Sequence, residues 1–137
     1  MNRQFTTAFT LCLILAVGLV VCSCNRQQIA PNGAGFLGVY ALISVNGELV
    51  PTSISHEGVT LQVRSGTLTI NADGTCSGKT VFVPPSGAEV VREVTATYTK
   101  DGSKLTMQWE GAGKTVGTIQ GNTFIMDNEG MAFVYRK

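Results

Sequence analysis

The chain has 137 residues, the length of one domain, and carries one histidine and four cysteines. From residue 24 onward nine Lys or Arg balance nine Asp or Glu, and this neutrality argues against a nucleic-acid-binding protein, which needs a basic face. Because His56 is the single histidine and Cys76 the single cysteine after Cys24, this segment lacks the residues for a His/Cys zinc site, a CxxC redox pair or an internal disulfide framework.

Residues 1–23 have the features of an export signal. Fifteen of them are apolar, and Arg3 is their single charged residue. Residues 11–21 are apolar apart from Gly18, which is the length of a signal-peptide hydrophobic region and is short for a stable membrane span. We therefore predict a signal peptide over residues 1–23.

The end of this segment, Val21-Cys22-Ser23-Cys24, resembles a bacterial lipobox, with Cys22 at −2 as a departure from the usual residues. The resemblance implies cleavage before Cys24 and diacylglyceryl attachment to its sulfur, often with a further acyl chain such as palmitate on the new N-terminus. Two or three acyl chains hold a protein firmly at a membrane, whereas one holds it marginally. With Asn25 next, the sorting rule for such lipoproteins implies the outer membrane of a diderm cell envelope. An uncut anchor or a plain secreted protein is the alternative.

Residues 24–35 show no periodicity and collect Pro31, Asn32 and Gly33, so we expect a flexible tether. The folded domain is predicted over residues 36–137. Within it, β-branched runs alternate with turn signals and predict eight strands near 37–46, 58–71, 75–83, 88–99, 103–110, 114–120, 123–127 and 131–136. Asp-Gly and Asn-Gly turns favour tight hairpins, so neighbouring strands should pair antiparallel.

Two details qualify this pattern. Val63 and Leu68 are an odd number of residues apart in the second strand, so a bulge at Ser65-Gly66 is needed to bring both inside. The stretch 49–58 is predicted to be a long loop.

One apolar face emerges from the alternation of the later strands, and no helix is predicted to cover it. The sheet can bury that face by curling until its last strand pairs with its first. The prediction is an all-β fold, an eight-stranded antiparallel up-and-down β-barrel, which encloses either a filled core or room for one small ligand.

Five stretches, residues 38–47, 65–75, 97–106, 117–123 and 133–137, together resemble the small bacterial lipocalin-like domains, which often occur as lipoproteins. The resemblance implies a calycin-like barrel in which Tyr40 stands where lipocalins carry a tryptophan. It also implies that Arg136 packs over Tyr40 in a cation–π contact. With about a hundred residues, shorter than a full lipocalin, the domain should have a small calyx.

No catalytic arrangement is recognisable in the sequence. His56 and Cys76 have no evident third group to complete a nucleophilic site, and Cys76 falls on an inward phase typical of a core residue. The acidic residues are spaced as solvated strand and turn charges. We therefore expect a protein that is not an enzyme and that uses no cofactor or metal.

Arg92 is the charged residue that conflicts with the alternation of apolar and polar residues. It is an even number of positions from Val94 and Tyr98 and so lies on the same face of the predicted strand. If that face is inside, its guanidinium needs a partner, which a ligand carboxylate or phosphate could supply. The candidate ligand-binding residues are then Arg92, Tyr98, Trp109, Met107 and Tyr135. In the alternative, Arg92 reaches water at the open rim and the aromatic residues are plain core.

These observations lead to two functional hypotheses. The first is a monomeric, non-enzymatic barrel, attached to the cell envelope through lipid on Cys24, that binds a small apolar or amphipathic molecule. The second is a filled barrel that presents its outer face or its loops to an envelope protein, as inhibitor, adaptor or assembly factor, with the loop 49–58 and the turn Pro84-Pro85-Ser86-Gly87 as the candidate contacts.

Overall fold

The computed structural model describes residues 33–137, so the predicted signal peptide, the lipidation site Cys24 and most of the tether lie outside the described residues. A short 3-10 helix, η1 (Gly33–Phe36), precedes ten strands. These are β1 (Gly38–Val45), β2 (Glu48–Leu49), β3 (Thr52–His56), β4 (Val59–Ile70), β5 (Thr75–Val83), β6 (Val90–Asp101), β7 (Lys104–Trp109), β8 (Lys114–Gln120), β9 (Thr123–Asn128) and β10 (Met131–Arg136). In this part of the chain no helix is both long and apolar enough to cross a membrane.

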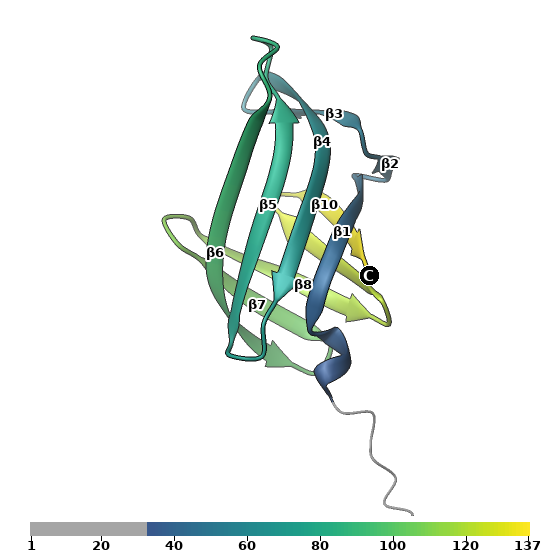
Figure 1. The fold of residues 1–137 in the computed structure, drawn as a ribbon, viewed down its shortest axis with the longest axis vertical. Helices are drawn as coiled ribbons and strands as arrows, with labels where there is room; N and C mark the ends of the chain where they lie inside the picture. Colours follow the sequence, from purple (N-terminus) through teal and green to yellow (C-terminus); the bar gives the residue numbers. More distant parts are fainter. Residues whose placement is uncertain (1–32) are drawn as a thin grey trace, which may run out of the picture.

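Eight of the strands form a closed antiparallel barrel (Figure 1). Each strand from β4 to β10 pairs with the next, and β1 closes the ring by pairing with both β10 and β4. Leu42 lies opposite Tyr135 in the closing pair, so the first and last predicted strands meet. The all-β class and the eight-stranded antiparallel barrel are therefore confirmed.

The prediction of a long loop over residues 49–58 was wrong. This stretch contains the end of β2, which pairs with β1, and the whole of β3, which pairs with β4 as a hairpin. Residues Glu57 and Gly58 both have positive φ, 50° and 78°, as the tight turns of hairpins require. Glu-Gly is a weaker turn signal than Asn-Gly, which is why the sequence pattern did not reveal the hairpin.

The predicted bulge in the second long strand is present, one position earlier than expected. The pairing of β4 with β5 shifts register between Val63 and Ser65, so Arg64 is the extra residue and is exposed. Val63, Gly66 and Leu68 are consequently all buried on the inside of the barrel.

The two ends of the barrel differ. At one end, here called the packed end, lie η1 and the turns at residues 71–74, 102–103 and 121–122. At the other, here called the open end, lie the turns at 57–58, 84–89, 110–113 and 129–130. Strands β4 and β6 have 12 residues each, whereas β7, β9 and β10 have six, so the β4–β6 side rises beyond the opposite side at the open end (Figure 1).

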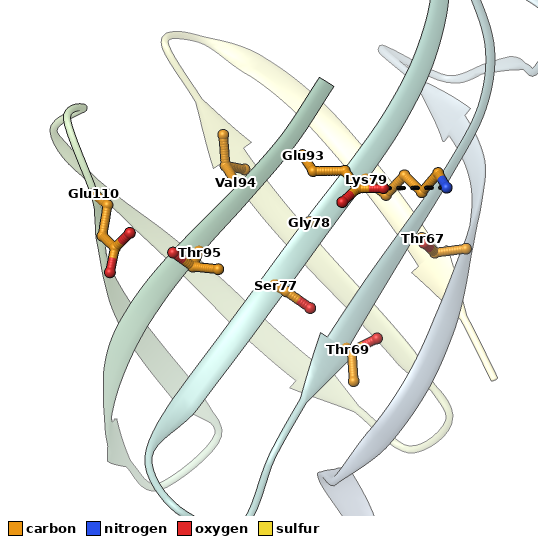
Figure 2. Close-up of a pocket in the computed structure, with 9 residues that line it drawn as sticks. All are labelled: Thr67, Thr69, Ser77, Gly78, Lys79, Glu93, Val94, Thr95 and Glu110. Carbon is orange, nitrogen blue, oxygen red and sulfur yellow. Dashed lines mark ion pairs between the residues drawn. The ribbon is translucent and has the colours of Figure 1, made fainter. Parts of the chain in front are cut away.

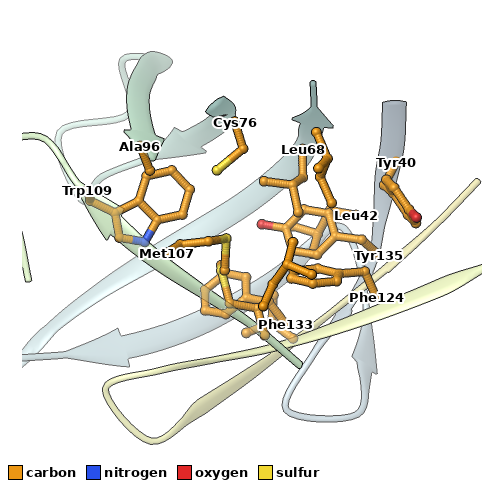
Figure 3. Close-up of a cluster of buried hydrophobic side chains, with 14 of the residues drawn as sticks. Tyr40, Leu42, Leu68, Cys76, Ala96, Met107, Trp109, Phe124, Phe133 and Tyr135 are labelled. Carbon is orange, nitrogen blue, oxygen red and sulfur yellow. The ribbon is translucent and has the colours of Figure 1, made fainter. Parts of the chain in front are cut away.

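Aromatic side chains fill much of the barrel interior (Figure 3). Phe124 is fully buried, with its ring centroid 6.1 Å from that of Tyr40 and 6.5 Å from that of Tyr135. Gly117 on the neighbouring strand leaves room for this ring, because a Cβ at that position would lie 1.9 Å from Cζ of Phe124. The packed end therefore depends on one glycine and one large aromatic residue facing each other.

Candidate functional site

A cavity of about 300 Å³ opens at the open end of the barrel. Its tall side comes from β3 to β6, which contribute Ile54, Leu61, Val63, Thr80, Phe82 and Val94. Its short side comes from β9 and β10, with Met126, Met131 and Phe133, and its inner part includes Leu68, Trp109 and Tyr135. The cavity exists because the long strands continue past the ends of the short ones, so their inward side chains have too few partners opposite.

Besides Tyr135, three ionisable side chains line this cavity, namely Arg92, His56 and Glu129. The Nε2 atom of His56 lies 3.4 Å from Oε2 of Glu129, and this contact joins the end of β3 to the β9–β10 turn. Arg92 is exposed and has no ion pair with any residue from 33 to 137. Its guanidinium is therefore an unpaired positive charge on the cavity lining, at the water-accessible rim.

The five predicted ligand-binding residues do not all meet. Arg92, Trp109 and Tyr135 line the cavity, whereas Met107 is fully buried in the core. Tyr98 lies six residues from Arg92 on β6, roughly 20 Å further toward the packed end. Even spacing in the sequence placed Tyr98 on the same face of the strand as Arg92. Such spacing predicts the face on which a side chain lies, but not its position along the barrel axis.

The indole ring of Trp109 is held in place on β7. Its Nε1 donates a hydrogen bond to Oγ1 of buried Thr115 at 2.7 Å. Gly78 on β5 lies against the ring, since a Cβ at that position would be 3.6 Å from Cη2 of the indole. The single tryptophan is therefore a fixed part of the cavity lining and a natural fluorescent reporter of it.

The predicted cation–π contact between Tyr40 and Arg136 is made by a different residue. Nζ of Lys137 lies 5.1 Å from the centre of the Tyr40 ring and donates hydrogen bonds to the carbonyl oxygens of Gly35 and Leu37. Arg136 is exposed, because it follows the inward Tyr135 and so points outward from β10. The cation over Tyr40 therefore comes from the residue after the strand.

Tyr40 itself is fixed from the packed end. Its hydroxyl donates to the carbonyl oxygen of Phe36 at 2.6 Å, and burial raises its pKa. Phe36 in turn packs edge-on against Tyr98, with ring centroids 6.1 Å apart. These contacts attach η1 to the packed end of the barrel.

His56 and Cys76 do not form a reactive pair. His56 is at the cavity mouth, whereas Cys76 is buried in the core and does not line the cavity. Burial raises the pKa of the Cys76 thiol to about 11, which keeps it protonated and poorly nucleophilic at neutral pH. Across residues 33–137 no group of three or more His, Cys, Asp or Glu side chains is arranged to hold a metal ion.

A second hollow, of about 410 Å³, lies on the outer face of β4 to β6 (Figure 2). The hydroxyls of Thr67, Thr69, Ser77 and Thr95 border it. An ion pair between Lys79 and Glu93, 3.1 Å apart, crosses it. Its lining has no aromatic or large apolar side chain other than Val94, so it offers little area for an apolar ligand.

Sequence reasoning missed the residues that β3 and the β9–β10 turn bring to the cavity. Ile54, His56 and Glu129 belong to this group. The available signal was the alternation of Thr52, Ile54 and His56 before a Glu-Gly pair, repeated as Glu129-Gly130 before β10.

No protein-family model matches the chain, and neither the curated proteins nor the solved structures contain a match.

Proposed function

We propose that the protein is a non-enzymatic binding protein whose open-end cavity takes one small apolar molecule with an acidic head group. The observation that carries this proposal is an apolar cavity of about 300 Å³ with the unpaired Arg92 at its rim. This volume is at the lower end of the range for small-molecule sites, which are mostly apolar with a few polar groups that orient the ligand. The acidic head lies at Arg92, in contact with water, and the apolar part lies among the inward side chains of β3 to β6.

The wider identity proposed is that of a lipocalin-like lipoprotein. The closed eight-stranded barrel is compatible with a lipocalin-like fold, and the resemblance of residues 38–47 and 65–75 supports the assignment. The stretch Val21-Cys22-Ser23-Cys24 supports lipid attachment at Cys24 and a position in the cell envelope. Under this proposal the membrane is reached through the acyl chains.

Binding is tested by the quenching of Trp109 fluorescence on titration with decanoate, dodecanoate, a retinoid-like probe and haem. We expect saturable quenching by at least one acid. Arg92→Leu should weaken binding of that acid roughly 2- to 5-fold, the effect of losing a solvent-exposed ion pair, and should leave its methyl ester unaffected.

Arg64→Leu is the matched control, because Arg64 is also an exposed arginine but does not line the cavity. It should bind every probe as the unmodified protein does. Flat titrations across the whole panel would refute small-molecule binding.

Lipid attachment is tested separately by mass spectrometry of the membrane fraction. We expect a mature chain that begins at residue 24 and carries the mass of two or three acyl chains. Cys24→Ala should abolish this species, and an unmodified mature chain would refute the anchor.

The second candidate function is an envelope protein-interaction module, and one observation favours it. Val90 and Val91 at the start of β6 are 39% and 50% exposed, next to the prolines of the β5–β6 turn. Apolar residues that project from a sheet can form a contact surface. The cavity, however, counts against a completely filled barrel, so we place this function second.

A further inference from the structure

The three tyrosines of the chain differ in what their hydroxyls contact. The hydroxyls of Tyr40 and Tyr98 each donate a hydrogen bond to a backbone carbonyl at 2.6 Å, Tyr40 to Phe36 and Tyr98 to Asn71. Tyr135 on β10 is only 4% exposed, yet its hydroxyl makes no hydrogen bond with any residue from 33 to 137. Of the three, Tyr135 is the one that lines the cavity.

The Tyr135 hydroxyl is directed toward the interior of the barrel (Figure 3). Every side-chain nitrogen or oxygen that is completely enclosed within residues 33–137 has a hydrogen-bond partner. The Tyr135 hydroxyl, which has none, must therefore still have accessible surface, and the space next to it is the cavity. The hydroxyl is therefore free to form a hydrogen bond with a molecule that enters this cavity.

A phenylalanine at position 135 would supply the same ring without a polar atom. Where an apolar ligand fills the cavity and excludes water, a hydroxyl left without a partner costs roughly 1–3 kcal/mol, whereas a phenylalanine has no such penalty. A tyrosine in this environment is therefore expected where its hydroxyl has a partner in the functional state.

The surroundings of this hydroxyl determine the chemistry of the partner. Burial raises the pKa of Tyr135, so the hydroxyl stays protonated and is available as a donor. Its neighbours along the cavity, among them Leu68 and Phe133, are apolar and offer no positive charge to a buried anion. The partner is therefore a neutral acceptor, such as a ketone, ester or ether oxygen.

We infer that Tyr135 donates a hydrogen bond to a neutral oxygen at the inner end of the ligand, while the acidic head of the same ligand lies at Arg92. The ligand class is thus an acid with a short apolar chain and a second oxygen function near its far end, such as an oxo acid. This inference rests on the proposed function, and it adds an orientation, head outward, and a second point of recognition.

The test pairs each oxo acid with its plain counterpart: 7-oxooctanoate with octanoate, 9-oxodecanoate with decanoate, and 11-oxododecanoate with dodecanoate. Affinities are measured by calorimetry for the unmodified protein, Tyr135→Phe and Tyr98→Phe. For at least one chain length, we expect the preference for the oxo acid to be roughly 2- to 12-fold greater in the unmodified protein than in Tyr135→Phe, the effect of one hydrogen bond. Tyr98→Phe should leave this preference unchanged, because its hydroxyl is bonded to the backbone far from the cavity.

A spectroscopic measurement separates a direct contact from a change of shape. In the complex with the unmodified protein, the infrared band of the ligand ketone should move to lower frequency, and Tyr135→Phe should restore it. Tyr135→Phe should be as stable as the unmodified protein or more so, because the Tyr135 hydroxyl has no hydrogen-bond partner within residues 33–137 that the substitution would remove.

Two results would overturn the inference in distinguishable ways. If the unmodified protein binds the acids but Tyr135→Phe shows the same oxo preference at every length, the contact does not exist and the proposed function stands. If the unmodified protein binds none of the six acids, the proposed function fails for this ligand class, and the inference fails with it.

Discussion

The packed end and the open end are built from the same eight strands, but they differ in how completely side chains fill the space between those strands. At the packed end, short strands face each other and bring Leu105, Phe124 and Tyr40 together with no exposed surface. At the open end, twelve-residue strands face six-residue strands, and the excess length leaves a space of about 300 Å³.

Strand length, more than residue type, therefore decides which end of the barrel is packed and which end holds the cavity. Both ends are rich in apolar residues, and both use a glycine beneath an aromatic ring: Gly117 under Phe124 at one, Gly78 under Trp109 at the other. At the packed end the space is fully occupied, whereas at the open end the ring borders a cavity. Substitutions should therefore affect folding at one end and ligand binding at the other.

The largest expected effect comes from removing volume at the packed end. Leu105→Ala removes a side chain with 0% exposure and should lower the free energy of unfolding by about 2–5 kcal/mol. Ile54→Ala, at the half-buried wall of the cavity, should cost less, about 1–2 kcal/mol, because that side chain already borders empty space. Urea unfolding followed by Trp109 fluorescence measures both, and equal costs would break the distinction between the ends.

Adding one methyl group tests the same packing from the opposite direction. Gly117→Ala places a Cβ within 1.9 to 2.7 Å of three atoms of the fully buried Phe124 ring, and should cost about 1–3 kcal/mol. Gly113→Ala, where a Cβ would meet nothing within 4 Å, is the control and should change stability little. If Gly117→Ala leaves the free energy of unfolding unchanged, the side chains of the packed end rearrange more readily than their contacts indicate.

Alkaline pH should weaken the interior through Cys76. Burial raises its pKa from 9.0 to about 11, so the thiol is neutral in the folded state at a pH where the unfolded chain ionises. The stability that this contributes is complete below pH 9 and is lost as the pH rises through about 11. Between these values the unmodified protein should lose on the order of 1 kcal/mol more than Cys76→Ala does. Parallel pH profiles for the two proteins would show that the thiol is accessible to water.

The smallest expected effect concerns the contact that attaches the C-terminus to η1. Lys137→Met removes the cation over Tyr40 and two hydrogen bonds to backbone carbonyls, and should cost below about 1 kcal/mol because the amine is exposed. Arg136→Met should cost less still, since Arg136 has no contact with the Tyr40 ring. Thermal unfolding distinguishes the two variants. A larger loss of stability for Arg136→Met would instead support the contact between Arg136 and Tyr40 that was predicted from the sequence.

The barrel could be predicted from the sequence because it depends on local patterns. Turn dipeptides and the alternation of apolar residues are visible within about ten residues. They predicted strands that correspond to β1 and to β4–β10, and they also predicted the bulge near Ser65. Strands β2 and β3 were not predicted, because the turns at Pro51 and at Glu57-Gly58 carry weaker signals than Asn-Gly.

The candidate site was less predictable, because it depends on depth along strands rather than on face. Arg92, Trp109 and Tyr135 were selected correctly as cavity-lining residues, but Tyr98 and Met107 share their inward phase and lie elsewhere. His56 and Glu129 are in contact although they are 73 residues apart in the chain, and no local pattern encodes this contact.

The position of η1 determines which way the cavity faces. Because Gly33–Phe36 is fixed beneath the barrel by Tyr40 and Tyr98, the preceding chain joins the domain at the end opposite the opening (Figure 1). Under the proposed lipid attachment at Cys24, the anchoring segment would thus enter the domain at its sealed base and leave the opening unobstructed. Under the proposed binding function, ligand exchange would then take place at the end of the domain away from its point of attachment.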